Sequence, residues 1–191
     1  MNRDIQLIVI GGSAGSLQVI FKIFKYIPAE FPVPFLIVLH RNVNFESALD
    51  ELLSVKSNLK VKEVEEKETI ESGYIYLCPA DYHVLIEKDK TFALDYSEKI
   101  HHSRPSIDVV FKSASATFHE HLVGILLSGA NADGGDGLKI IKDNGGLTIV
   151  QDPDESEVSY MPHHALQKFK ADFVLESGKI GRFIFDLNAR A

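Results

Sequence analysis

The sequence opens, after a short polar start, with Leu7-Ile8-Val9-Ile10-Gly11-Gly12-Ser13-Ala14-Gly15-Ser16. Four branched apolar residues in succession are typical of a strand that is covered on both faces. The glycines that follow permit a tight reversal of the backbone, and an amphipathic segment comes next. We therefore predict a strand, a sharp turn and a helix, with Ser13 presented at the turn.

The pattern Gly11-x-Ser13-x-Gly15 matches the nucleophile elbow of serine hydrolases. A serine at the start of a helix lies near unpaired amides and the positive end of the helix dipole, which stabilise a developing oxyanion. The pattern alone leaves a second interpretation open, in which Ser13 or Ser16 only caps the helix. Phosphate-binding loops fit less well, because the Gly-Lys-Ser/Thr of a Walker A motif is absent and a dinucleotide fingerprint would have glycine in place of Ser13.

Strand and helix patterns alternate along the rest of the chain. Apolar runs predict further strands at 34–39, 59–64, 122–127, 147–151 and 173–175. Helical spacing and breakers predict helices over 17–26, 45–55, after Ser106, over 138–144, after Pro162 and from about residue 179. This alternation predicts an α/β fold with a doubly wound, mainly parallel sheet and helices on both faces, in one domain spanning 1–191.

The alternation of strands and helices is interrupted between the second and third predicted helices. The segments 74–77, 84–87 and 92–96 are short and strand-like, and Asp89-Lys90 is a plausible hairpin turn between the last two. We predict a small antiparallel β hairpin insertion in the α/β chain. It could form one wall of a cleft or be a plain edge hairpin, and the sequence leaves both open.

Composition excludes several classes of function. The chain has 191 residues, 45% hydrophobic and 25% charged, with a formal charge of −7. That charge argues against a nucleic-acid surface and against binding to anionic membranes. The apolar runs never approach the roughly 18 residues of a membrane span, and no signal peptide is recognisable. Cys78 is the single cysteine, so we expect a buried thiol, no internal disulfide and a cytoplasmic protein.

Three of the predicted buried strands are followed by Ser13, His40 and the loop that contains Asp133. Ligand sites of open α/β sheets gather at the carboxyl ends of the strands. Serine, histidine and carboxylate together suit acyl transfer, because imidazole takes the hydroxyl proton and the carboxylate orients the imidazole. The order Ser, His, Asp differs from that of α/β-hydrolases. His40 as a surface histidine, and Asp133 and Asp136 as turn residues, remain alternatives.

Metal binding is the rival use of the eight histidines. His101-His102 and His163-His164 are adjacent pairs, whose side chains diverge. His119 and His121 could share one face of a strand, but no third ligand is evident. We therefore predict no metal site and no cofactor.

Several segments, taken in order, resemble the catalytic domain of the chemotaxis receptor methylesterases of the CheB type. They are 11–15 (GGSAG), 39–40 (LH), 78–83 (CPADYH), 103–111 (SRPSIDVVF), 127–134 (LSGANADG) and 161–162 (MP). The resemblance covers nearly the whole chain. It implies a protein-glutamate methylesterase that hydrolyses glutamate γ-methyl esters on the cytoplasmic helices of receptors and deamidates glutamine.

The resemblance also implies roles for individual residues. Ser13 would be the nucleophile, His40 the general base and Asp133 the group that orients the histidine. The oxyanion would be bound by the backbone amide of Ala14 and an amide near Ala130. Family members often have threonine and methionine at these last two positions. Alanine at both keeps the backbone donors but alters the side chains that would contact a receptor helix.

Members of the family commonly begin with a phosphoacceptor receiver domain and a linker. The first predicted strand here starts within ten residues of Met1, so we expect no receiver domain, no control by phosphorylation in cis, and regulation through a separate protein if at all. Two other functions remain open on the sequence alone: a catalytically weak module that binds receptors or signalling partners, and a hydrolase of small esters or amides.

Overall fold

Seven strands form the main sheet, in the order β3-β4-β2-β1-β7-β8-β9. The structure is a computed structural model that describes residues 4–40 and 49–188. The strands are β1 (Leu7–Gly12), β2 (Phe35–Leu39), β3 (Lys60–Glu63), β4 (Tyr74–Leu77), β7 (Leu122–Leu126), β8 (Leu147–Gln151) and β9 (Phe173–Leu175). Every neighbouring pair is parallel. The prediction of a parallel sheet is confirmed.

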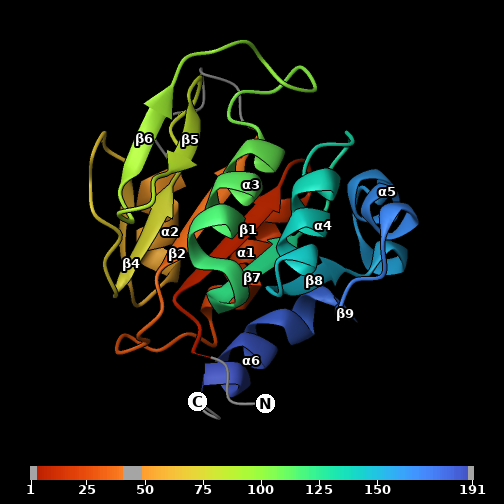
Figure 1. The fold of residues 1–191 in the computed structure, drawn as a ribbon. Helices are drawn as coiled ribbons and strands as arrows, with labels where there is room; N and C mark the ends of the chain where they lie inside the picture. Colours follow the sequence, from red (N-terminus) through yellow and green to blue (C-terminus); the bar gives the residue numbers. More distant parts are fainter. Residues whose placement is uncertain (1–3, 41–48, 189–191) are drawn as a thin grey trace.

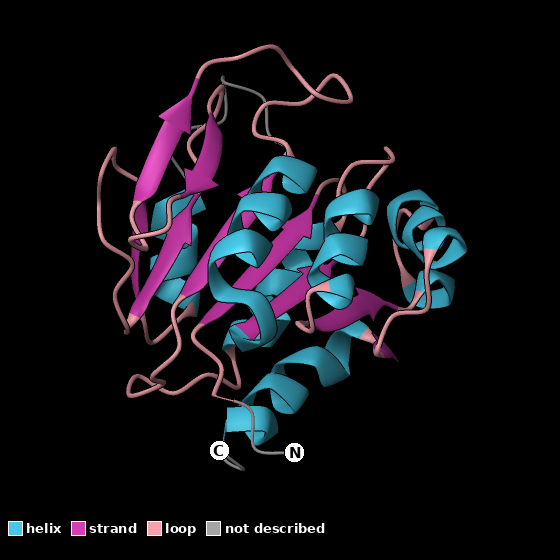
Figure 2. Cartoon of the chain, in the orientation of Figure 1, coloured by secondary structure: helices cyan, strands magenta, loops and turns pink. Residues whose placement is uncertain are grey.

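Helices cover both faces of the sheet (Figures 1 and 2). One face carries α1 (Ser16–Phe24), α2 (Leu49–Lys56) and α6 (Ser177–Asn188). The other carries α3 (Ile107–Phe118), α4 (Gly135–Asp143) and α5 (Tyr160–Lys168). The chain is therefore doubly wound, as its strand and helix patterns predict.

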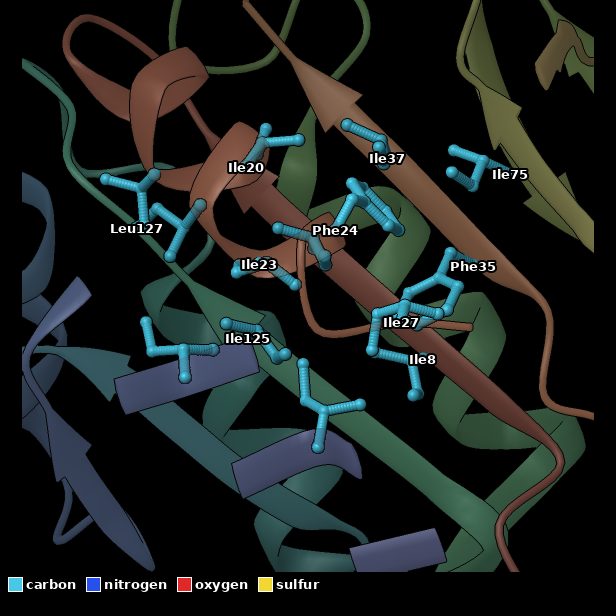
Figure 3. Packing of buried hydrophobic residues seen from close by; sticks show 14 of the residues in the cluster. Ile8, Ile20, Ile23, Phe24, Ile27, Phe35, Ile37, Ile75, Ile125 and Leu127 are labelled. Atoms are coloured by element: carbon cyan, nitrogen blue, oxygen red, sulfur yellow. The ribbon is translucent and has the colours of Figure 1, made fainter. Parts of the chain in front are cut away.

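Alternate residues of the central strands point to opposite faces of the sheet and pack into two separate hydrophobic cores. Ile8 and Ile10 of β1 pack beneath α1, whereas Leu7 and Val9 face the α3 side. Figure 3 shows the first of these cores, in which Ile20, Ile23 and Phe24 of α1 lie over strand residues such as Ile8 and Ile125. A strand buried on both faces explains why residues 7–10 are uniformly apolar.

A two-stranded antiparallel hairpin, β5 (His83–Ile86) and β6 (Phe92–Asp95), stands apart from the main sheet. The predicted hairpin insertion is confirmed, but the segment 74–77 is not part of it. That segment is β4 and lies inside the main sheet, between β3 and β2. Its mostly buried residues fit a covered strand.

Several predicted boundaries differ from those of the structure. Helix α4 begins at Gly135 rather than at 138, and α5 begins at Tyr160, so Pro162 lies in its first turn, where a missing N–H leaves no helical bond unmade. The predicted helix 45–55 corresponds to α2, and its first four residues lie outside the described residues. His119–His121 forms the short 3₁₀ helix η2 and not a strand. A second 3₁₀ helix, η3, spans Pro153–Glu155.

Over residues 4–40 and 49–188, none of the helices has the length and apolar character that crossing a membrane requires.

Candidate active site

The candidate nucleophile and base lie side by side because β1 is paired with both β2 and β7. Gly12 is in register with Leu39, and Gly11 with Leu126. The pairing continues beyond the strands: His40 N–H donates to the Gly12 carbonyl, and Ser13 N–H donates to the Ser128 carbonyl at 2.9 Å. The carboxyl ends of three central strands thus bring Ser13, His40 and the loop of Asp133 to one edge of the sheet.

The turn after β1 presents Ser13 without using its side chain as a helix cap. Gly15 is the N-cap of α1, with φ 79°, and no side chain caps this helix. The Ser16 hydroxyl instead donates to the Ser13 carbonyl at 2.6 Å. The interpretation in which Ser13 or Ser16 only caps the helix is therefore wrong, and the half-buried Ser13 hydroxyl has no hydrogen bond with any other described residue.

His40 and Asp133 form a close pair. Nε2 of His40 lies 2.8 Å from Oδ2 of Asp133, the carboxylate is fully buried, and the histidine side chain is 10% exposed. His40 is therefore not the free surface histidine of the alternative interpretation. A buried carboxylate on one imidazole nitrogen fixes the orientation of the ring, which is the arrangement that a general base requires.

Asp133 also anchors the start of α3. Its Oδ1 accepts hydrogen bonds from the Ser106 hydroxyl and the Asp108 amide, and its Oδ2 accepts one from the Ile107 amide at 2.6 Å. Burial raises the pKa of the Asp133 carboxyl, but the hydrogen bonds from His40 and from the amides of Asp108 and Ile107 outweigh burial and lower it. Asp133 is thus held as the anion beside His40.

Donors for an oxyanion are available beside Ser13. The backbone amides of Ala14 and Ala130 have no acceptor among the described residues, whereas the amide of Gly129 is used by the Val158 carbonyl at 3.1 Å. Their place in the loops after β1 and β7 suits the expected role, which remains a prediction. The candidate nucleophile and the candidate base follow neighbouring strands that are in register, and no hydrogen bond joins Ser13 to His40 among the described residues.

Comparisons with known proteins identify the family of this chain. The family profile described as CheB methylesterase matches residues 8–184. The chain belongs to the CheB methylesterase family. A Leptospira interrogans protein provisionally named protein-glutamate methylesterase/protein-glutamine glutaminase is 44% identical over 183 residues, which cover 96% of this chain and 95% of that protein. A Methanospirillum hungatei protein-glutamate methylesterase/protein-glutamine glutaminase 2 is 36% identical, over 100% of this chain and 54% of its own length.

The fold of this CheB methylesterase chain also matches a solved structure. The crystal structure of the Thermotoga maritima CheB methylesterase catalytic domain superposes with a TM-score of 0.91 at 31% identity, over 96% of this chain and 98% of that one. The resemblance that the sequence motifs indicate is therefore confirmed over nearly the whole chain, and the fold class with it.

Three residues of the site in this CheB methylesterase escaped the sequence analysis. Asn131 donates through Nδ2 to Nδ1 of His40 at 3.2 Å. Ser106, which precedes a predicted helix and has a side chain that suits the N-cap position, accepts from the Val109 amide and also donates to Asp133. Gly129 lies so close to Ser13 that an added Cβ would be 3.1 Å from the Ser13 Cβ. Only the cap signal of Ser106 was visible in the sequence.

The remaining candidate residues lie elsewhere. Asp136 pairs with Lys168 at the surface and forms no hydrogen bond or ion pair with His40 or Ser13. Cys78 is buried in the core on the α3 side. Over the part of the chain that the structure describes, no three side chains of His, Cys, Asp or Glu gather as they would around a metal ion.

Replacing Gly15 with alanine should damage the turn that presents Ser13. The residue has φ 79°, and an added Cβ would lie 2.7 Å from the Glu157 Cβ and 2.8 Å from the Ser128 Oγ. We expect a loss of roughly 1–3 kcal/mol in the free energy of unfolding together with reduced esterase turnover, measured by thermal denaturation and kinetics.

Gly73→Ala is the matched control for this substitution. Gly73 also has a positive φ, 84°, but no atom lies within 4 Å of its added Cβ. It should therefore lose stability through backbone strain alone and keep its turnover. If Gly15→Ala lost no more stability and no more turnover than Gly73→Ala, the close packing around the turn would have no importance for the site.

Asp108 is a second buried carboxylate, next to Asp133. Burial raises the pKa of its carboxyl, the Gly137 amide opposes that rise, and the nearby charge of Asp133 adds to it. An acid whose pKa is raised in the folded state begins to cost stability as the pH rises above its unfolded-state pKa, and the cost is complete once the pH exceeds the folded-state pKa. The Asp108→Asn substitution would keep the Oδ1 that accepts the Gly137 N–H at 2.6 Å and would remove the buried charge.

We therefore expect Asp108→Asn to raise the melting temperature by a few degrees at pH 7–8. The gain should vanish as the pH falls below about 3.9, where the wild-type carboxyl is protonated in both states. Melting curves across pH measure this, with the exposed Asp143→Asn as a control. A melting temperature at pH 8 below that of the wild type would show that the Asp108 charge stabilises the fold.

Proposed function

We propose that this protein is a serine esterase that hydrolyses γ-methyl esters of glutamate on chemotaxis receptors and deamidates the corresponding glutamines. The proposal rests on one observation: in a chain of the CheB methylesterase family, Ser13, His40 and buried Asp133 meet at the carboxyl edge of the sheet. The relatives are named for these two activities. The substrate segment would be the cytoplasmic helices of a receptor, which places the reaction in the cytoplasm.

The first half of the reaction forms an acyl-enzyme. The Ser13 oxygen attacks the ester carbonyl carbon, and its proton passes to His40. The negative charge that develops on the carbonyl oxygen is stabilised by the amides of Ala14 and Ala130. When the bond to the methoxy oxygen breaks, the proton on His40 moves to that oxygen and methanol leaves.

The second half releases the glutamate. Water gives a proton to His40 and attacks the Ser13 ester, and the proton then returns to the Ser13 oxygen as the glutamate carboxylate departs. For glutamine the leaving group is ammonia instead of methanol. Asp133 remains ionised throughout and stabilises the imidazolium ion that forms in each half. Ser13, His40 and the attacking water supply and receive every proton in these steps, so the steps need no cofactor.

The decisive experiment compares substrates. Purified protein is given a receptor that carries labelled methyl esters, and released methanol is measured against release from small methyl esters. We expect turnover on the receptor to exceed that on small esters in kcat/KM, and Ser13→Ala to abolish both. Equal or better turnover of small esters would support a small-molecule hydrolase, and the absence of both activities would support a module that only binds.

A further inference from the structure

Asn131, in the loop between β7 and α4, forms hydrogen bonds with both His40 and Asp133. Its Nδ2 donates to Nδ1 of His40 at 3.2 Å and to the Ser103 hydroxyl at 3.2 Å. Its Oδ1 accepts the Asp133 backbone N–H at 3.1 Å. The side chain is half-buried. All the hydrogen-bonding groups of this one amide are thus used within the site.

These contacts determine which way the amide is oriented. A backbone N–H can only donate, so the atom that faces Asp133 N–H is the oxygen of Asn131, and the nitrogen faces His40. Because that nitrogen carries hydrogens, Nδ1 of His40 must be the acceptor and carries no proton. On the other side of the ring the ionised Asp133 can only accept, so Nε2 carries the proton. Both neighbours require the same tautomer.

We propose that Asn131 is a positioning residue that holds His40 in its Nε2–H tautomer, with the lone pair of Nδ1 as the site that takes the Ser13 proton. The inference rests on the proposed function for its catalytic consequence, but the tautomer itself does not. Asp133 sets the proton on Nε2, and Asn131 fixes the plane of the ring from the opposite edge. The histidine is therefore clamped between two fixed partners, and its basic nitrogen is Nδ1.

The hydrogen bond between Asn131 Nδ2 and His40 Nδ1 has to break during each half-reaction. Nδ1 has a single in-plane lone pair, so the hydrogen bond from Asn131 Nδ2 has to break before Ser13 can pass its proton to Nδ1. Once Nδ1 is protonated, it is a donor that faces the donor Nδ2, and the hydrogen bond cannot re-form. The protonated nitrogen can then donate to the leaving methoxy oxygen. When the proton has left, Asn131 donates to Nδ1 again and restores the starting tautomer before the next turnover.

Asn131→Asp tests this arrangement with the smallest change in shape. The variant keeps an oxygen for the Asp133 amide but places a carboxylate against Nδ1. With Asp133 on one nitrogen and the new carboxylate on the other, the ring should hold two protons. We expect kcat at pH 7 to fall about 100-fold, KM to stay within about threefold, and the pH of half-maximal kcat/KM to rise by about two units or more, since only such a rise leaves about one imidazole in a hundred neutral at pH 7.

A spectroscopic measurement reads the tautomer without any substrate. In protein labelled with ¹⁵N-histidine, the ring signals of His40, assigned with His40→Ala, should show hydrogen on Nε2 only in the wild type and on both nitrogens in Asn131→Asp at pH 7. This measurement distinguishes the positioning role from a loop-folding role, because loss of folding would move all the histidine signals toward common random-coil positions, whereas a change of protonation converts the signals of His40 alone.

Two further variants serve as controls. Gln167→Glu adds the same charge at an exposed position of α5 and should keep the wild-type pH profile. Asn131→Ser retains an oxygen for the Asp133 amide and lacks the amide nitrogen, so it should lose less turnover than Asn131→Asp and keep the profile nearly unshifted.

A wild-type spectrum with the proton on Nδ1 would overturn the inference, as would an Asn131→Asp variant with wild-type kcat and pH profile. If the spectra agree with the inference but no methyl ester is hydrolysed, the proposed function fails and the positioning role stands. If Ser13→Ala abolishes hydrolysis while Asn131→Asp changes nothing, the proposed function stands and the inference fails.

Discussion

Ser13→Ala is expected to abolish covalent labelling by a serine-directed phosphonate and to reduce turnover of methylated receptor by roughly four to six orders of magnitude. The oxygen that would form the acyl bond is removed, and His40 and Asp133 have no proton transfer left to assist. What remains is the binding of substrate and the stabilisation of the oxyanion by backbone amides, which are unchanged.

The fold should persist in this variant. The Ser13 hydroxyl makes no hydrogen bond with the described residues, and the turn is held by backbone contacts, Ser13 N–H to the Ser128 carbonyl and Ser16 N–H to the Ser13 carbonyl. Thermal melting should therefore match the wild type. The exposed Ser54→Ala on α2 controls for loss of a serine and should label normally. Retention of more than about a tenth of the wild-type rate with a normal melting curve would mean that Ser13 is not the nucleophile.

The sequence could predict that the candidate site residues lie close together, because each of them follows an apolar run that is recognisable within its own segment. The run 7–10, the run 34–39 and the run 122–127 are each long and apolar enough to indicate a buried strand, and each is followed by a polar residue or loop. Parallel strands share a carboxyl edge, so Ser13, His40 and Asp133 were expected to meet. The structure places them there because β2, β1 and β7 are neighbours.

Contacts between distant segments could not be predicted in this way. The strand 74–77 looked like part of the hairpin insertion because it is short, yet it inserts between β3 and β2. Likewise α4 begins with Gly135 and Gly137, which disfavour helix, and the Asp108 carboxylate from α3 accepts the Gly137 amide. Tertiary contacts determine where β4 lies in the sheet and where α4 begins, and the hydrophobic periodicity within each segment contains no information about those contacts.

For the candidate base, too, the residue types could be predicted from the sequence but the contacts could not. Histidine and aspartate were identifiable by type and position, but the pairing of Nε2 with Asp133 and of Nδ1 with Asn131 depends on side-chain geometry. In the sequence Asn131 is an ordinary loop residue. Turn chemistry was the expected alternative for Asp133, and it is partly correct, since the same carboxylate binds the first amides of α3.

This double role determines what Asp133→Asn should do. An asparagine has one oxygen, and on either side its nitrogen would face a backbone N–H, that of Ile107 or that of Asp108. We expect the free energy of unfolding to fall by about 1–3 kcal/mol at pH 7. The folded-state pKa of Asp133 is lowered, so its stabilising contribution is present above about pH 3.9 and is lost as the pH falls further through the folded-state pKa. The difference from wild type should therefore shrink in acid.

Turnover of Asp133→Asn should fall by about four orders of magnitude, the loss that the equivalent change causes in serine proteases, because an amide neither fixes the Nε2–H tautomer of His40 nor stabilises the imidazolium ion. The matched control is Asp136→Asn, three residues further along the chain in the first turn of α4. Asp136 pairs with Lys168 at the surface, so that variant should keep most of its turnover and nearly all of its stability. Steady-state kinetics and urea unfolding of both variants measure these expectations. Equal losses of turnover would mean that the loop matters only as a turn, and that Asp133 does not act through His40.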